Sequence, residues 1–230
     1  MRIFVKKTYY EAYDDRYRQV HDQSLRWFAE SPSPIVHDTI REFGIQKTDK
    51  LLEIGCGEGR DASFLLHGGY DLLATDVSPA ALDFCRKEFP EYADRFRILD
   101  CLNSQCSERF DFIYAIAVVH MLVPDSDRAK FYVFIREHLT ESGIGLICSM
   151  GDGVTQRRSD PSKAFELQDR VHEATGQRLK IASTSYRSVS FEAFEDELRS
   201  VDLKILKKGI TAVEPDYGKM MYAVVKRAGT

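Results

Sequence analysis

A short apolar run followed by three alternate glycines constrains this chain more than any other stretch. Residues 51–54 read LLEI, which is typical of a short buried strand, and Gly55, Gly57 and Gly59 follow directly. Residues 61–67 then have the apolar spacing of a helix that packs on a sheet. Glycine permits a positive φ and has no Cβ to block a ligand. The pattern therefore predicts a strand, a tight turn and a helix that bring main-chain N–H groups close to a small ligand.

The spacing of these glycines distinguishes between two kinds of nucleotide site. The dinucleotide fingerprint G-x-G-x-x-G requires a glycine where this chain has Arg60. Glu53 stands two residues before the first glycine, and the resulting pattern E-x-G-x-G-x-G resembles motif I of the class I S-adenosylmethionine-dependent methyltransferases. The resemblance runs over residues 50–150 and is strongest to small-molecule branches, the tellurite-resistance (TehB-like) proteins and methyltransferase types 11, 12 and 25. Asp61 departs from the asparagine of the TehB-like branch, and a tight turn without a ligand remains the alternative.

The resemblance implies a fold as well as a ligand. We expect an α/β protein with a Rossmann-like seven-stranded, mostly parallel sheet, an antiparallel last strand, helices on both faces and an N-terminal helical cover. The whole chain, 1–230, is predicted to be a single methyltransferase domain. Its parts are a helical lid (1–47), a cofactor-binding half (48–150), and a substrate-side insertion with a closing hairpin (151–230).

Two acidic residues end the second and third predicted strands. Asp76 follows a strand at 70–75 and lies 23 residues after Glu53, close to the spacing at which a carboxylate binds a ribose. The alternative for Asp76 is a helix cap, but Ser78 followed by proline is the better cap. The resemblance implies that Asp100 accepts from the adenine amino group and that the Cys101 N–H faces adenine. The alternative for Asp100 is an Asx turn at the strand end.

The expected cofactor is S-adenosyl-L-methionine, with S-adenosyl-L-homocysteine as the product. The resemblance implies contacts from the strand ends, the glycine loop and one lid tyrosine. The predicted cofactor-binding residues are Tyr17, Glu53, Gly55, Cys56, Gly57, Arg60, Asp76, Val77, Asp100, Cys101 and Ala115. No metal site is expected, because the five cysteines have no C-x-x-C spacing and read as buried free thiols.

His120 is the candidate catalytic residue. It follows a strand at 110–115, and the transferred methyl group should lie close to residues 115–120. A neutral imidazole can take a proton from the acceptor near pH 7. The alternatives are a substrate contact without proton transfer and a structural histidine. The Asn/Asp-Pro-Pro-aromatic motif of the DNA-modifying branch is absent, since residues 115–118 read AIAV.

The segments outside the cofactor half are less family-like. Tyrosines at helical spacing over residues 9–17 predict a helix that continues to about residue 30, either as a core helix or as a lid that touches the ligand. Ser33 and Pro34 should begin a second helix that ends at Gly44. Residues 154–178 read as an insertion that shapes the substrate pocket, and the alternative is a solvated loop with one helix over 163–174. Its arginines could meet an anionic substrate group. Two apolar runs, 203–210 and 217–226, predict the closing hairpin, whose turn holds Pro215 and Asp216.

Composition limits the partners. The net charge of −4 gives no basic footprint for bulk nucleic-acid binding, and no apolar run reaches membrane-spanning length. We therefore expect a cytoplasmic enzyme with a small-molecule substrate and no membrane partner, and nucleic acid is disfavoured. RNA or protein methylation and a non-catalytic binding module remain alternatives, and a homodimer is left open.

Overall fold

A seven-stranded mixed sheet forms the centre of the molecule. The computed structural model describes residues 7–27, 31–104, 106–172, 174–213 and 217–229. The strand order is β10-β11-β5-β4-β1-β2-β3, and only β11 runs against its neighbours. The strands are β1 (Lys50–Ile54), β2 (Asp71–Asp76), β3 (Phe96–Ile98), β4 (Phe110–Ile116), β5 (Leu139–Met150), β10 (Leu203–Val213) and β11 (Tyr217–Arg227). The predicted fold class is confirmed, including the antiparallel last strand.

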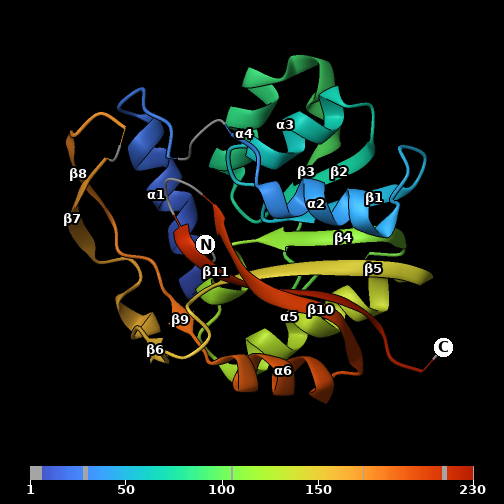
Figure 1. The fold of residues 1–230 in the computed structure, drawn as a ribbon. Coiled ribbons are helices and arrows are strands. Elements are labelled where there is room, and N and C mark those ends of the chain that lie inside the picture. Colours follow the sequence, from blue (N-terminus) through green and yellow to red (C-terminus); the bar gives the residue numbers. More distant parts are fainter. Residues whose placement is uncertain (1–6, 28–30, 105, 173, 214–216, 230) are drawn as a thin grey trace, which may run out of the picture.

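Helices cover both faces of the sheet (Figure 1). Side chains alternate along each strand, so Leu51 faces one core and Leu52 faces the other. The first core packs under α2 (Pro34–Phe43), α3 (Arg60–His67) and α4 (Pro79–Glu88). The second packs under α5 (Asp125–His138) and α6 (Phe191–Ser200). A 3₁₀ segment, η2 (Pro90–Arg95), leads into β3.

The N-terminal cover is shorter than predicted. It consists of the 3₁₀ turn η1 (Tyr9–Glu11) and α1 (Ala12–His21), and the prediction that this helix continues to about residue 30 is wrong. Ser24 takes a left-handed φ of 57°, which ends the helical path, and residues 28–30 lie outside the described part. The second helix is confirmed, with Pro34 in its first turn and Gly44 in a left-handed conformation at its end.

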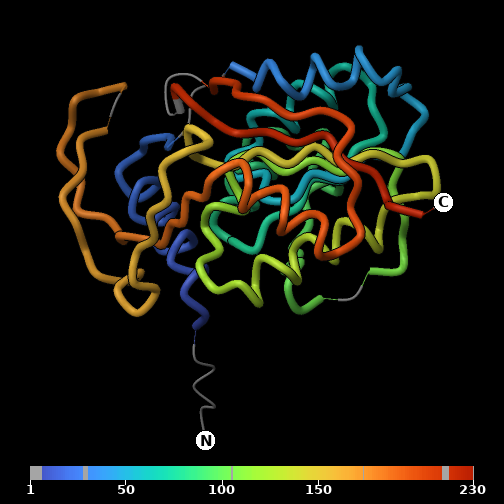
Figure 2. Tube along the Cα trace, turned by 60° about the horizontal axis from the view of Figure 1, so that its bottom comes forward, coloured from blue at the N-terminus to red at the C-terminus, as the bar shows by residue number. Residues whose placement is uncertain are grey.

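The insertion after β5 is built from strands, so the alternative of a solvated loop with a helix over 163–174 is wrong. Strands β7 (Leu167–Val171) and β8 (Arg178–Ala182) form a hairpin, and β6 (Arg157–Arg158) pairs with β9 (Arg187–Ser188). A short 3₁₀ turn, η4 (Pro161–Lys163), lies between β6 and β7. Leu179 and Ile181 of β8 are buried against Val20 of α1, which favours a two-faced strand pair over a helix. Figure 2 shows this hairpin at one side of the molecule, with α1 between it and the sheet.

The chain closes with the β10–β11 hairpin, as predicted, although Pro215 and Asp216 in its turn lie outside the described residues. Among the residues described here, no helix is both long and apolar enough to span a membrane.

Candidate active site

A pocket lies where the carboxyl ends of β1, β2, β3 and β4 meet the lid. It encloses about 920 Å³ of empty space, open mouth included, which is in the range of ligand sites. Because parallel strands present their carboxyl ends at one edge, residues far apart in sequence meet there. Ten of the eleven predicted cofactor-binding residues line this pocket: Tyr17, Glu53, Gly55, Cys56, Gly57, Arg60, Asp76, Val77, Asp100 and Cys101.

The glycine loop adopts the expected conformation but commits its N–H groups to the protein. Gly55, Gly57 and Gly59 have φ of 75°, 54° and 79°. The N–H groups of Gly55 and Cys56 donate to the Thr75 carbonyl at 2.7 and 2.9 Å, and the Gly57 N–H donates to Asp76 Oδ2 at 2.8 Å. The expectation that these N–H groups face a ligand is therefore wrong. A phosphate cradle needs such donors free, so this loop is not built for a pyrophosphate.

Asp76 lies on the pocket wall at the end of β2, where the sequence predicts a ribose ligand. Its carboxylate is 8% exposed and also accepts from the Ser78 N–H at 2.8 Å. Burial raises its pKa, and the backbone hydrogen bonds partly oppose this. Each carboxylate oxygen keeps capacity for a second hydrogen bond. The Ser78 hydroxyl accepts from the Ala81 N–H, which confirms Ser78 as the helix cap and leaves Asp76 for another role.

Asp100 forms the predicted Asx turn and also lies on the pocket wall. Its Oδ1 accepts from the Leu102 N–H at 2.9 Å, which is the Asx turn, while its carboxylate also lines the pocket. Its Oδ2 accepts from the Tyr10 hydroxyl at 2.9 Å, so the lid already touches this group. Burial raises the pKa of the neighbouring Cys101 thiol to about 12, so the thiol stays neutral. The adenine contacts of both residues stay predictions.

The inner end of the pocket is acidic. Glu53 is 3% exposed and accepts from the Tyr114 hydroxyl at 2.9 Å. Burial raises the pKa of Glu53 well above its usual value, and the nearby Asp61 adds to this. Arg60 donates to the Ser33 hydroxyl at 3.0 Å. Four carboxylates and one guanidinium line the pocket, an excess that favours a cationic ligand: Glu53, Asp61, Asp76, Asp100 and Arg60.

The lid is held by the same loops that build the pocket. Tyr10, Tyr13 and Tyr17 line the pocket from η1 and α1, and their helical spacing was the signal available in the sequence. Asp14 accepts from the Ser78 hydroxyl at 2.8 Å, and Glu58 of the glycine loop accepts from the Trp27 N–H at 2.8 Å. Nothing local in the sequence distinguishes these two acids from surface ones.

The remaining wall comes from the segment after β4. Ala117, Val118, Met121 and Leu122 line it, partly from the 3₁₀ turn η3 (Val119–Met121). Ala117 has a left-handed φ of 59°, which is unfavourable for a residue with a Cβ. Sequence reasoning placed the methyl group near this segment but did not identify which side chains form the wall.

Two predicted residues of this segment do not line the pocket. His120 is 2% exposed and absent from the pocket wall, and burial, with Arg128 and Arg16, lowers its pKa to about 3. A base this weak and this enclosed is poorly suited to take a proton near pH 7, so the geometry does not support the predicted base role. Ala115 packs into the α5–α6 core, because alternation along β4 turns Ile116 toward the pocket instead.

The predicted role of the insertion in shaping the substrate pocket stays a prediction. No described residue of 154–178 lines this pocket, and the β7–β8 hairpin packs against the outer side of α1. Its arginines therefore do not line this pocket. Within the described part of the chain, no group of three or more His, Cys, Asp or Glu residues is arranged to hold a metal ion.

Comparison with known proteins identifies the domain. Residues 52–144 match a family model described as "Methyltransferase domain", of type 12. Over these residues the chain is similar to methyltransferase domains. This confirms the resemblance carried by the glycine motif, while the TehB-like branch stays a prediction. The match spans β1 to β5, the strands that carry the glycine loop and both acids.

Solved and curated relatives of the methyltransferase domain cover different shares of the chain. The Burkholderia thailandensis 1,6-didemethyltoxoflavin-N1-methyltransferase, crystallised with 1,6-didemethyltoxoflavin and S-adenosylhomocysteine, is similar with a TM-score of 0.69 and 17% identity, over 100% of this chain and 94% of that one. Hemagglutinin 1 of Eikenella corrodens is 35% identical over 123 residues, 50% of this chain and 39% of that protein. Ribosomal RNA small subunit methyltransferase A of Porphyromonas gingivalis is 36% identical over 75 residues, 33% of this chain and 28% of that protein. The chain thus spans well under half the length of these two curated relatives.

Proposed function

We propose that the protein transfers a methyl group from S-adenosylmethionine to a small molecule. The observation that carries this proposal is the chemistry of the glycine loop and its surroundings. The N–H groups that a pyrophosphate would need are committed to Thr75 and Asp76, and the pocket carries four carboxylates. A cofactor with an ammonium and a sulfonium suits this environment, and a dinucleotide does not.

The residues on the wall fit the parts of that cofactor. Asp76 would accept from the ribose hydroxyls, and Asp100 and Cys101 would face the adenine. Glu53 and Asp61 supply negative charge for the ammonium, with Arg60 beside them for the carboxylate. The cofactor supplies an electrophilic methyl group and leaves as S-adenosylhomocysteine. The toxoflavin enzyme, which has the same fold, is crystallised with that product.

The acceptor side of the pocket is apolar and aromatic. Val118, Met121, Leu122, Tyr10 and Tyr13 form it, and none of them is an effective base at pH 7. The chain therefore contributes alignment and exclusion of water, and the acceptor supplies its own lone pair. A lid tied down over the pocket suits a small acceptor better than a polymer. The proposal extends to the whole chain as one methyltransferase unit.

The test is calorimetry with S-adenosylmethionine, S-adenosylhomocysteine and NAD. We expect both sulfur nucleosides to bind and NAD to show no binding. A metabolite library is then screened by release of S-adenosylhomocysteine to find the acceptor. If neither sulfur nucleoside binds, the proposal is wrong; if both bind and no acceptor in any class is methylated, the domain is a binding module.

RNA methylation is the second candidate, because the rRNA methyltransferase of P. gingivalis matches 33% of this chain. The net charge of −4 disfavours it. Cellular RNA included in the same screen decides between the two acceptor classes. The five cysteines are free thiols in the structure, which is consistent with the reducing cytoplasm that we propose as the location.

A further inference from the structure

The loop from Ala117 to Val123 forms part of the pocket wall, and side chains from other elements support it. Ala117 has a φ of 59°, so the loop begins in an unfavourable conformation that its surroundings must maintain. Its only regular structure is the single turn η3. Yet this loop provides Val118, Met121 and Leu122 to the acceptor side. Something outside the loop must therefore hold it.

Four carbonyl groups of the loop each accept a hydrogen bond from a side chain elsewhere in the chain. Arg128 of α5 donates Nη1 to the carbonyls of Val119 and Leu122, at 2.8 and 3.4 Å. The Ser185 hydroxyl donates to the carbonyl of Met121 at 2.8 Å. Arg187 donates to the carbonyl of Val123, also at 2.8 Å.

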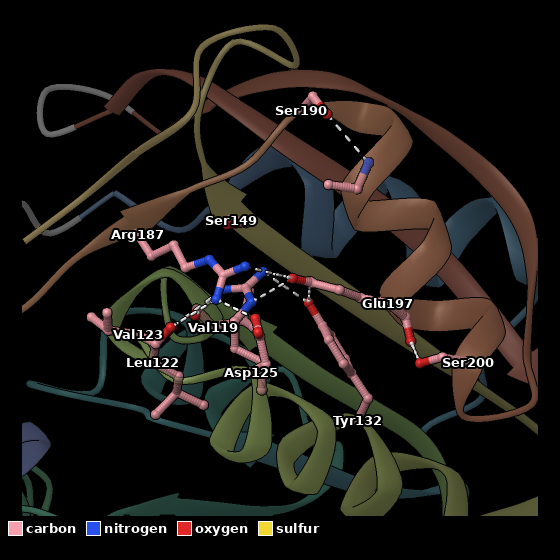
Figure 3. A network of polar contacts seen from close by, with 12 residues as sticks. Val119, Leu122, Val123, Asp125, Tyr132, Ser149, Arg187, Ser190, Glu197 and Ser200 are labelled. Carbon is pink, nitrogen blue, oxygen red and sulfur yellow. Dashed lines mark hydrogen bonds and ion pairs between the residues drawn. The ribbon is translucent and has the colours of Figure 1, made fainter.

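Arg128 is itself held by a carboxylate from the last helix. It is 1% exposed, and its Nε and Nη2 donate to Oε1 and Oε2 of Glu197 at 2.8 and 2.6 Å. The buried Tyr132 hydroxyl donates to the same Oε2 at 2.8 Å. Figure 3 shows Glu197 and Tyr132 meeting on one side of this network, with Val119, Leu122 and Arg187 on the other side. The Arg128 guanidinium thus donates through Nε and Nη2 to Glu197 and through Nη1 to the loop.

A buried ion pair of this kind is a weak device for stability. Well-packed apolar residues of similar volume often replace such a pair without loss, because two charges need no longer be taken out of water. What apolar residues cannot do is donate to the two loop carbonyls. What Arg128 contributes, and an apolar residue would not, is therefore a hydrogen-bonding group that holds the loop in position.

We infer that Arg128 and Glu197 are positioning residues for methyl transfer. The pair, with Tyr132, holds the loop after β4 in the shape that aligns the acceptor, without touching cofactor or acceptor. We name these three residues the loop clamp. This inference rests on the proposed function. It means that side chains of α5 and α6, which do not line the pocket, control how the acceptor is aligned.

The test replaces the loop clamp by apolar residues of similar shape, in the triple variant Arg128→Met, Tyr132→Phe, Glu197→Leu. We expect the melting temperature to change by about 5 °C or less. Amide exchange at Met121 and Leu122, whose N–H groups donate to Val118 and Val119 in the native loop, should accelerate about tenfold or more. Exchange in β1 and β2 should not change.

Activity separates positioning from simple structure. With the acceptor found by screening, kcat should fall about thirtyfold or more, while the Kd for S-adenosylhomocysteine stays within about threefold. Arg199→Met removes an exposed ion-pair partner from the same helix α6 and is the matched control, expected to change neither exchange nor kcat. Glu197→Gln, which keeps the shape of the side chain, should give a smaller shift in the same direction and serves if the triple variant does not fold.

Unchanged exchange at Met121 and Leu122 in a folded variant would overturn the inference, as would full kcat with a loosened loop. These outcomes are distinct from failure of the proposed function. If the wild-type protein binds neither sulfur nucleoside, the function is wrong, and the exchange measurement still decides whether the clamp holds the loop.

Discussion

Gly55→Ala tests the contact that joins the cofactor loop to the acceptor loop. Gly55 has a φ of 75°, and a Cβ added there would lie 2.4 Å from Cγ2 of Val118. Gly44 has nearly the same backbone conformation, φ 67°, and a Cβ added there would meet nothing within 4 Å. The pair therefore separates backbone strain from close approach. Gly44→Ala has the strain alone, and Gly55→Ala has the strain and the clash.

The magnitudes follow from these two geometries. Holding an alanine in the left-handed region costs about 1–2 kcal/mol. The lower entropy of the unfolded alanine variant offsets about 0.4–1 kcal/mol of that cost, so Gly44→Ala should lose roughly 1 kcal/mol of unfolding free energy. A contact of 2.4 Å cannot persist, so Val118 or its backbone must move. Overpacking of this kind adds about 1–3 kcal/mol, which gives a total of roughly 2–4 kcal/mol for Gly55→Ala.

Urea unfolding of the ligand-free protein measures both losses, and a double-mutant cycle with Val118→Ala identifies their source. Val118→Ala removes the Cγ2 atom. In the Gly55→Ala background it should therefore restore about 1 kcal/mol or more of the lost unfolding free energy, and in the Gly44→Ala background it should restore none. Equal losses for the two glycine variants, or no coupling to Val118, would refute the close approach of the β1 and β4 loops.

Three further results are expected. Asp76→Asn should raise the Kd for S-adenosylhomocysteine about thirtyfold or more, because charge-assisted hydrogen bonds to the ribose are lost; an unchanged Kd in calorimetry would remove Asp76 from the ribose. Binding of cationic S-adenosylmethionine should release protons, since burial raises the pKa values of Glu53 and Asp76 and a nearby cation lowers them. The binding enthalpy should then depend on the ionisation enthalpy of the buffer, and identical enthalpies in all buffers at every pH tested would contradict this. The folded-state pKa of His120, lowered to about 3, means that the folded protein resists its protonation. The neutral ring therefore contributes its full stability above about pH 6.5, and this contribution falls as the pH drops toward 3. In urea titrations the unfolding free energy of His120→Gln should fall less than that of wild type between about pH 7 and 4.5. An equal fall in both proteins would argue against burial of the neutral ring.

The cofactor half could be predicted closely because its signals are local. The apolar run before Gly55 and the acids at the ends of the next two strands are each read within a few residues of sequence. Parallel strands then bring those ends to one edge without further information. Ala115 was misplaced by a single position, because alternation along β4 could be read in either phase in a strand apolar on both faces.

The structures of the lid and the insertion were harder to predict, because the residues that they pack against lie far away in the chain. The end of α1 at His21 and the β7–β8 hairpin depend on the contact of Val20 with Leu179 and Ile181. A polar segment such as 163–174 shows no clear period, so helix and strand cannot be distinguished before that contact exists.

Residue patterns alone were enough to predict the sheet, the glycine turn between β1 and α3, and the acids that end β2 and follow β3. These follow from strand periodicity and from the conformations that glycine permits. The partners of the buried polar groups could be read only from the folded chain: the N–H groups of Gly55 and Cys56 donate to Thr75, the Tyr10 hydroxyl to Asp100, and Arg128 to the loop after β4. Local pattern reports which residues are buried, but a buried polar group takes its partner from whatever the fold brings within about 3 Å.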